Sequence, residues 1–323
     1  PVRRGYLLPT QSIAYGASAV ALLCFLGFTG AVHYFRGFPD RLGPEGAAFV
    51  RAHYDDSGRR LNLKAIGPGE VQLGYDKAPP SFVLWGDSHA RMLMQQVSRL
   101  ANELALSGRG IYRGGCPPFF GLNEQQRSKF RKCLPLIEEA YERTRSPEIT
   151  NVIMIARWAG YADESNPAVG NFSLRLAPGD RHRNRAEFAR LLRTTVEKLL
   201  AAGRTVTLLG PVPELPFHLP RVMTQALMRG RQADFSVPYS DFLKREETVL
   251  RVLAELDQLP GVRVLYPHLR LCDGVRCTTV KDGKPLYYDD DHLNAVGAEL
   301  LSDLLREALT PPTVAQEVVG NIK

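Results

Sequence analysis

The stretch Phe82-Val83-Leu84-Trp85-Gly86-Asp87-Ser88-His89-Ala90 decides the fold. Its four apolar residues predict a short buried strand, and Gly86 permits a tight turn directly into a helix. Ser88 would then lie at a helix N-terminus, where free backbone N–H groups and the helix dipole favour a developing negative charge. This position suits a nucleophile and one half of an oxyanion hole. Taken alone, a serine here is more often only the helix N-cap.

Short apolar runs alternate with longer amphipathic runs from residue 81 onward. This alternation predicts an α/β fold, a parallel five-stranded sheet with helices on both faces, over residues 81–310. Ligands of such sheets bind beyond the carboxyl ends of the strands, where 159–184 is expected to form a loop. Residues 36–80 are predicted to be a linker or small extension. The expected strands are 82–85, 111–112, 152–155, 206–209 and 262–266, and the expected helices are 89–106, 124–145, 185–202, 240–258 and 295–309.

The composition excludes several classes of protein. Hydrophobic residues make up 44% of the 323 residues and charged residues 23%, which is typical of globular proteins and argues against general disorder. The net charge of +7 comes from 41 Lys and Arg against 34 Asp and Glu. Apart from an Arg-rich run at 181–193, which is typical of a solvated helix face, the basic residues are scattered. A nucleic-acid partner is therefore not expected, whereas an anionic glycan or lipid headgroup stays open.

Residues 13–35 contain no Asp, Glu, Lys or Arg and are predicted to form a transmembrane helix. As a helix they would extend about 34 Å, enough to cross a bilayer core. A signal peptide has a shorter apolar core, and a buried helix of this length is rarer. Arg3 and Arg4 precede the segment while Arg36 and Arg41 follow it, so positive charge alone does not set the orientation.

Cysteine usage suggests the orientation. Cys24 lies inside the apolar segment, and the other four form two local pairs, Cys116 with Cys133 and Cys272 with Cys277. Neither pair has the spacing of a zinc knuckle. Paired cysteines beyond a membrane span favour disulfides in an oxidising compartment, although free thiols in a cytosolic domain remain an alternative. Four cysteines allow three connectivities, of which we predict the local one.

A second segment, Tyr287-Tyr288-Asp289-Asp290-Asp291-His292-Leu293-Asn294, supplies a candidate base. A serine hydroxyl needs an adjacent base to act as a nucleophile, and an imidazole oriented by a carboxylate can serve. Asp289 precedes His292 by three residues, a spacing that lets its carboxylate reach the near ring nitrogen. A solvated turn or a hard-cation site is the competing interpretation of the aspartates. His89, as the direct neighbour of Ser88, is expected to point elsewhere.

These two segments resemble the first and last conserved blocks of the SGNH hydrolase superfamily. Further stretches resemble, more narrowly, the SGNH domain that is fused to acyltransferase type 3 membrane proteins. The matching stretches are Trp85-Gly86-Asp87-Ser88-His89-Ala90, Gly115-Cys116-Pro117-Pro118, Ala156-Arg157-Trp158-Ala159-Gly160-Tyr161, Gly210-Pro211-Val212-Pro213-Glu214 and Tyr288-Asp289-Asp290-Asp291-His292-Leu293. The resemblance implies a flavodoxin-like three-layer αβα sandwich preceded by one transmembrane helix.

The resemblance also implies roles for individual residues. Ser88 would be the nucleophile, His292 the base and Asp289 the carboxylate that orients it. The backbone N–H groups of Ser88 and Gly115 would form the oxyanion hole. Neither a metal nor a cofactor bound to this chain is implied.

One block departs from the superfamily pattern. Its third block carries an asparagine in Gly-x-Asn-Asp, and this motif does not occur in the sequence. The corresponding position, after the third strand, holds Arg157 and Trp158. Either side chain can only donate hydrogen bonds, so either could replace the asparagine. Trp158 is equally consistent with a packing aromatic residue.

The family implies transfer of an acyl group, usually acetyl, to hydroxyls of an envelope or secreted polysaccharide. An upstream acyltransferase type 3 membrane domain would take acetyl from cytoplasmic acetyl-CoA and deliver it outward. Pro1-Val2-Arg3-Arg4 resembles the end of that membrane domain, so residues 1–12 are expected to be its last part, and 311–323 a tail. The domain after the span is then expected on the periplasmic side of the inner membrane. A carbohydrate esterase with the same triad, or a non-catalytic glycan-positioning domain, are the alternatives.

Overall fold

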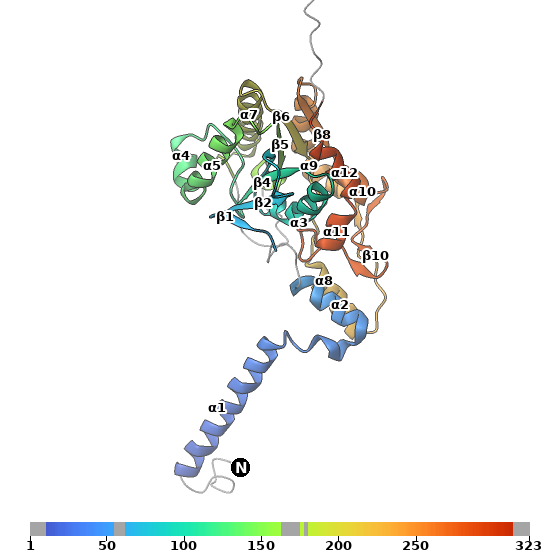
Figure 1. The fold of residues 1–323 in the computed structure, drawn as a ribbon. Coiled ribbons are helices and arrows are strands. Elements are labelled where there is room, and N and C mark those ends of the chain that lie inside the picture. Colours follow the sequence, from blue (N-terminus) through green and yellow to red (C-terminus); the bar gives the residue numbers. More distant parts are fainter. Residues whose placement is uncertain (1–10, 55–61, 163–174, 178–179, 313–323) are drawn as a thin grey trace, which may run out of the picture.

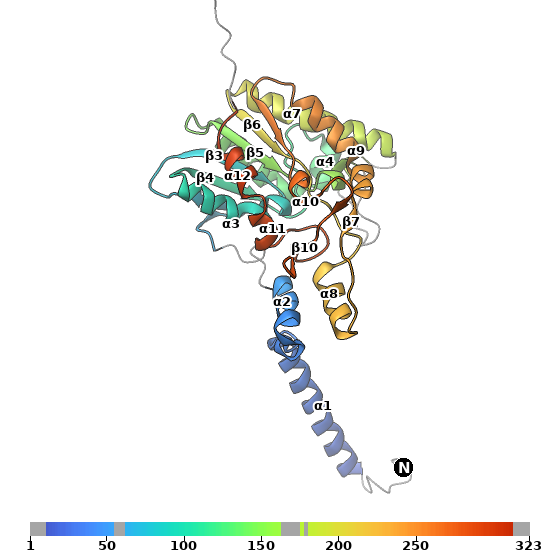
Figure 2. The ribbon, with the colours of Figure 1, turned by 90° about the vertical axis from the view of Figure 1, so that its right-hand side faces the viewer.

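The chain forms one long N-terminal helix and an α/β domain, seen in two views in Figures 1 and 2. The computed structural model describes residues 11–54, 62–162, 175–177 and 180–312. Most of the expected end of a membrane domain at 1–12, most of the expected tail at 311–323 and part of the expected loop at 159–184 lie outside these residues. Helix α1 (Gln11–Tyr34) extends away from the domain, and none of its residues is buried. Its length and apolar composition suffice to cross a membrane.

A seven-stranded sheet forms the centre of the domain, in the order β1-β2-β4-β3-β5-β6-β8. The five strands from β4 to β8 in this order are parallel, as the sequence predicts, while β2 and β1 are added antiparallel at one edge. All five residues of β5 are buried, which fits a strand covered on both faces. The strands are β1 (Ala65–Gly67), β2 (Glu70–Gly74), β3 (Pro80–Gly86), β4 (Ser107–Tyr112), β5 (Asn151–Ile155), β6 (Thr205–Leu209) and β8 (Val262–Leu265).

The expected linker at 36–80 is more structured than its composition suggests. It contains the short 3-10 helix η2 (Pro39–Leu42), helix α2 (Gly43–Tyr54) and the β1–β2 hairpin. Residues 70–74 of β2 pair with residues 107–111 of β4, so this segment completes the sheet of the domain. The predicted extension within 36–80 thus includes a hairpin that is part of the central sheet.

Helices cover both faces of the sheet (Figure 1). Helix α3 packs with α11 and α12 on one face, and α5 and α7 lie on the other. Two buried clusters result, one on each side of the strands. The helices of the domain are α3 (Ser88–Glu103), α4 (Glu124–Lys129), η3 (Arg131–Cys133), α5 (Leu134–Arg145), α6 (Trp158–Ala162), α7 (Arg181–Ala201), α8 (Leu219–Met228), α9 (Tyr239–Leu256), α10 (His268–Leu271), α11 (Ala295–Glu299) and α12 (Ser302–Leu309).

Two predicted helices are interrupted. The segment 124–145 consists of α4, η3 and α5, and Asn123 begins α4 with a reciprocal capping box to Gln126. Pro135 at the start of α5 suits a new first turn, because proline lacks the N–H that a helix interior requires. The segment 295–309 is likewise divided into α11 and α12. Helix α8 was not predicted, and Figure 2 shows it beside α2 at the end of the domain that faces α1.

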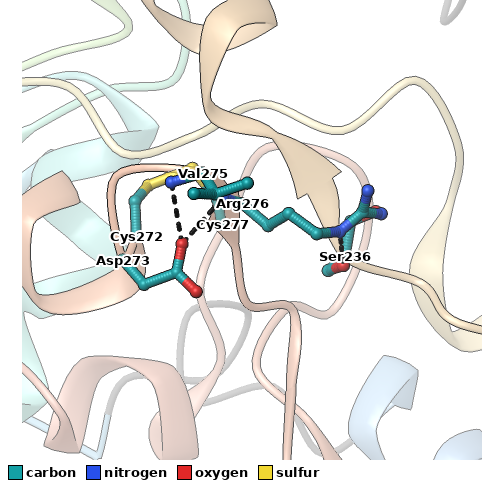
Figure 3. The surroundings of a disulfide bond; sticks show 6 residues. All are labelled: Ser236, Cys272, Asp273, Val275, Arg276 and Cys277. Carbon is teal, nitrogen blue, oxygen red and sulfur yellow. Dashed lines mark hydrogen bonds between the residues drawn. A yellow bond between two sulfur atoms is a disulfide. The ribbon is translucent and has the colours of Figure 1, made fainter.

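Both predicted disulfides are present, and Cys24 in α1 is free. The Cys272–Cys277 bond closes a small loop, shown in Figure 3. Asp273 accepts backbone N–H groups within this loop, including that of Arg276 at 2.8 Å. The Arg276 side chain in turn bonds to Ser236, beside strand β7 (Val237–Pro238), which pairs with β9 (Arg276–Cys277). The disulfide thus closes the loop that carries β9, while the pairing with β7 and the Arg276 bonds join this loop to residues 236–238.

Candidate active site

Ser88 is the first residue of α3 and follows the carboxyl end of β3, near the middle of the parallel strands. The N-cap of this helix is Asp87, whose carboxylate accepts the backbone N–H of His89 at 2.8 Å. The same carboxylate accepts the backbone N–H of Arg157 and the hydroxyl of Tyr161, each at 3.0 Å. Because Asp87 performs the capping, the Ser88 hydroxyl is not needed for it. Asp87 belongs to the motif around Ser88, but no local pattern predicted this role for it.

His292 is held by two carboxylates. Its Nδ1 atom lies 2.9 Å from Oδ2 of Asp289, the predicted partner, and 2.9 Å from Oδ1 of Asp291. The other oxygen of Asp289 accepts the backbone N–H of His292 at 2.8 Å, which fixes the loop. Although burial opposes the charged form, hydrogen bonds to the two carboxylates raise the pKa of His292 to about 10. The Nε2 atom is buried and has no hydrogen-bond partner among the described residues.

Asp291 connects His292 to a buried charge network that the sequence did not reveal. One oxygen of Asp291 lies 3.3 Å from Nε2 of His89 and 3.0 Å from Nε of Arg157. Arg157 also forms a two-point ion pair with Glu214, at 3.1 and 2.6 Å. Burial opposes the charge on Asp291, but its hydrogen bonds to the two histidines hold its pKa below the usual range. The prediction that His89 points away from the site is wrong.

The loop that carries His292 packs against the first turns of α3. The rings of His89 and His292 lie 5.0 Å apart, and the backbone N–H of Leu293 contacts the sulfur of Met92 at 3.2 Å. The Ser88 hydroxyl and the His292 ring form no hydrogen bond with each other in the described part of the chain. Catalytic hydrogen bonds are often long without substrate and tighten in the complex. The fold therefore brings the predicted nucleophile and base into one region, separated by about 200 residues of sequence.

The predicted oxyanion donors have different surroundings. Gly115 lies in the turn after β4 with a φ of +69°, which favours glycine, and a side chain added at its neighbour Gly114 would meet Cβ of Ser88 at 4.0 Å. Trp158 is buried, and its Nε1–H donates to the carbonyl of Leu209 at 2.8 Å. Of the two interpretations of Trp158, this contact favours the packing aromatic residue, because its only side-chain donor is already used. The donors of Arg157 that form contacts are directed at carboxylates.

The acidic run also meets the geometric condition for holding a metal ion. Ligand atoms of His89, Asp291 and His292 lie within 4.8 Å of one another, as do those of Asp289, Asp290 and Asp291. Most of these atoms already bond to each other or to backbone N–H groups. Burial and the two neighbouring aspartates raise the pKa of Asp290 to about 7. Within the cluster the aspartates bond to the two histidines and to backbone N–H groups, while Nε2 of His292 and Nδ1 of His89 have no hydrogen-bond partner among the described residues.

Comparisons with known proteins agree with this fold. A family model described as the SGNH domain fused to AT3 domains matches residues 51–307. The periplasmic domain of a lipopolysaccharide acetyltransferase from Salmonella ser. Paratyphi A is similar in structure, with a TM-score of 0.53 and 16% sequence identity, over 72% of this chain and 85% of that one. A putative acylhydrolase from Bacteroides fragilis NCTC 9343 matches with a TM-score of 0.40 and 14% identity, over 80% and 96%. A search of curated proteins finds no match.

The family model covers most of the chain, including both segments that carry Ser88 and His292 and the β1–β2 hairpin. The similar periplasmic domain supports the same α/β fold independently of the sequence motifs. The chain therefore belongs to the family of SGNH domains that are fused to AT3 domains.

Proposed function

We propose that this domain transfers an acetyl group to a hydroxyl of an envelope or secreted polysaccharide through an acetylated Ser88. The Ser88 oxygen would attack the acetyl carbonyl while Nε2 of His292 accepts the hydroxyl proton, and that proton would pass to the leaving group. In the second half, a sugar hydroxyl would attack the acetyl-serine and give its proton to His292, and His292 would pass that proton to the departing Ser88 oxygen as the acetyl-sugar is released. The backbone N–H groups of Ser88 and Gly115 would stabilise the oxyanion in both halves.

The observation that carries this proposal is the different bonding of the two nitrogen atoms of the His292 ring. One nitrogen is fixed by Asp289 and Asp291, and the other is buried without a partner among the described residues. A buried, unpaired polar atom is costly, and such atoms concentrate where a substrate or reacting group completes the bonding. Helix α3 begins at Ser88, and the N–H groups of its first turn that Asp87 does not accept have no intrahelical partner.

The fusion implied by the family favours transfer over hydrolysis. We propose that an upstream membrane domain supplies acetyl derived from acetyl-CoA, that α1 anchors the chain in the inner membrane, and that the SGNH domain works on the periplasmic side. Under this proposal the chain itself binds no cofactor, because the acyl group arrives already activated. The two disulfides fit an oxidising compartment.

Acetylation of Ser88 can be tested directly. Incubation of the purified chain with p-nitrophenyl acetate, followed by rapid quenching and mass spectrometry of peptides, should locate the acetyl group on Ser88. Its decay should be at least about tenfold faster with an oligosaccharide acceptor than in buffer, with acetyl-sugar as the product. Equal decay with and without acceptor, and acetate as the product, would establish an esterase instead.

A variant separates catalysis from simple glycan positioning. Ser88→Ala should abolish both acetylation and labelling by a fluorophosphonate, because the nucleophilic oxygen is removed. Ser98→Ala, on the same helix but distant from its N-terminus, is the matched control and should label normally. If the wild-type chain is neither acetylated nor labelled, the domain is not a serine acyltransferase.

A further inference from the structure

A cavity of about 880 Å³ opens beside Ser88. Its walls come from the start of α3, the turn after β4, the start of α5 and the β1–β2 hairpin, and Gly114 lies next to Ser88 in its lining. The volume is within the range of ligand-binding clefts. Since the proposed nucleophile lines this cavity, an acceptor that receives the acetyl group would occupy it.

The acidic side chains of this cavity are already neutralised. Glu70 and Glu139 are the carboxylates in its lining. Arg143 lies between them, with its Nε 3.1 Å from Glu70 and 2.7 Å from Glu139. Arg109 adds a longer contact to Glu70 at 3.9 Å. Glu70 is only 3% exposed, so its carboxylate is part of the wall, and the charge of the more exposed Glu139 is offset by its contact with Arg143.

Three cations in the lining have no such neutralising partner. Arg91, Arg113 and Lys132 line the cavity, and none of them forms an ion pair with a carboxylate in the part of the chain that the structure describes. Arg91 follows Ser88 by three residues in α3, a spacing that places both on one helix face. Arg113 directly precedes Gly114, and Lys132 lies in η3.

A disulfide holds two of these cations in one wall. The bond between Cys116 and Cys133 joins the turn after β4 to η3. It therefore connects the residue next to Lys132 with the loop that carries Arg113 and the proposed oxyanion donor. Positive charges of this kind, held without partners around a cleft, raise the local concentration of anions and favour their binding.

We propose that the acceptor is an anionic glycan, in which a carboxylate or phosphate group close to the acetylated hydroxyl is bound by Arg91, Arg113 and Lys132. This inference rests on the proposed acetyl transfer and names its substrate class. Arginine side chains match carboxylate and phosphate oxygens with two parallel hydrogen bonds, and lysine adds a point charge. The three cations line the same cavity as Ser88, so they would select the sugar residue that reaches the nucleophile.

Matched acceptors test the charge requirement. With p-nitrophenyl acetate as donor, the acceptors are a trisaccharide of uronic acids, its carboxyl-reduced neutral form and a phosphate-bearing trisaccharide. We expect kcat/KM for at least one anionic acceptor to exceed that of the neutral form by about tenfold or more at low salt, and the preference to shrink as ionic strength rises. Which anionic acceptor is preferred distinguishes a carboxylate from a phosphate. Equal transfer to all three would overturn the inference while leaving the acetyl transfer intact.

Substitutions of lining residues test whether the preference for anionic acceptors arises in this cavity. Arg113→Gln and Lys132→Gln should each lower the ratio of anionic to neutral kcat/KM by about fivefold, since each removes one partly exposed charge contact. Arg113→Lys should retain most of the ratio. The control is Arg131→Gln, because Arg131 neighbours Lys132 in η3 but is outside the lining. An unchanged ratio in the Arg113 and Lys132 variants would contradict the assignment.

Binding provides a readout that does not depend on catalysis. In Ser88→Ala, isothermal calorimetry should show tighter binding of an anionic trisaccharide than of its neutral counterpart. Loss of that difference in the Ser88→Ala/Lys132→Gln double variant would support the inference even if acetyl transfer itself failed. Equal affinities in Ser88→Ala would refute the inference whatever the reaction proves to be.

Discussion

The Nδ1 atom of His292 lies 2.9 Å from an oxygen of Asp289 and 2.9 Å from an oxygen of Asp291. One carboxylate is enough to fix the ring in its reactive orientation. The second makes the protonated form more stable, which is why the pKa of His292 reaches about 10 despite burial. At neutral pH the resting imidazole is therefore charged, and the fraction that can accept the serine proton increases with pH.

The rate of Ser88 acetylation should follow this titration. For the wild-type chain with p-nitrophenyl acetate, we expect the rate to rise between pH 7 and about pH 10. Asp291→Asn removes one of the two negative charges at Nδ1, so the midpoint should shift at least about one pH unit lower. The pre-steady-state burst of p-nitrophenol, measured by stopped flow across pH, reports the midpoint. Asp290→Asn is the matched control, because the ion pairs of the His292 ring in the described part of the chain are with Asp289 and Asp291 and not with Asp290.

The same pKa makes a prediction for stability. A histidine whose pKa is about 10 when folded and about 6.5 when unfolded stabilises the fold fully below pH 6.5, and this contribution is lost as pH rises through 10. Urea unfolding of the wild-type chain should therefore show the contribution declining from pH 7 to pH 10. His292→Gln should show a flatter dependence over this interval. Parallel curves for the two proteins would mean that the carboxylates do not bind the charged imidazole.

Sequence motifs identified those site residues whose partners lie nearby in the chain. Asp289 and His292 are three residues apart, and the helix start at Ser88 follows from Gly86 and the apolar strand before it. Asp291 and His89 were missed because their contact joins positions 202 residues apart. No local pattern specifies such a pair, and only the packing of the last loop on α3 brings them together.

At the scale of elements, the turn between β3 and α3 positions the nucleophile. Gly86 lies against β5, and a side chain there would collide with the carbonyl oxygen of Ile155 and approach Cβ of Ala90 to 2.8 Å. Strand and helix can therefore follow each other without an intervening loop only because residue 86 lacks a Cβ. The Asp87 hydrogen bonds then fix the turn to the loop after β5.

Replacing this glycine should damage both folding and chemistry. Gly86→Ala is expected to reduce the free energy of unfolding by about 1–3 kcal/mol, because backbone must move to accept the methyl group. Ser88 would move with the turn, so the acetylation rate should fall further than the loss of folded protein explains. Urea titration and active-site labelling measure the two effects. Gly67→Ala is the stability control, since its nearest neighbour would be 3.9 Å away, and equal effects of both variants would contradict the packing argument.

Elements with strong apolar runs were predictable, and those without were not. The strands β5, β6 and β8 are marked by contiguous β-branched and aliphatic residues. The hairpin β1–β2 is short, contains glycine and lies at the sheet edge, so its sequence resembles a linker. Its pairing with β4 depends on a tertiary neighbour that a local pattern does not include.

At the scale of the whole molecule, the two disulfides and helix α1 suggest one orientation. Helix α1 offers an apolar surface with no partner in the described domain, and the domain beyond it holds all four bonded cysteines. Disulfides persist on the oxidising side of a membrane. Part of the net charge of +7 lies near the proposed nucleophile, because three cations without a carboxylate partner in the described part of the chain line the same cavity as Ser88.

The orientation can be checked chemically. Non-reducing peptide mapping of the protein from its native membrane should show Cys116 linked to Cys133 and Cys272 to Cys277, with Cys24 free.

The Cys116–Cys133 disulfide should also contribute to stability. Cys116 and Cys133 are 17 residues apart, so Cys133→Ala should lower the free energy of unfolding by about 3 kcal/mol in the chain-entropy account. It should also weaken any preference for anionic acceptors, because η3 is released from the loop after β4. Cys24→Ala should change neither quantity, since Cys24 lies in α1, outside the domain. Four free thiols in native protein would instead place the domain in a reducing compartment and remove the basis for periplasmic action.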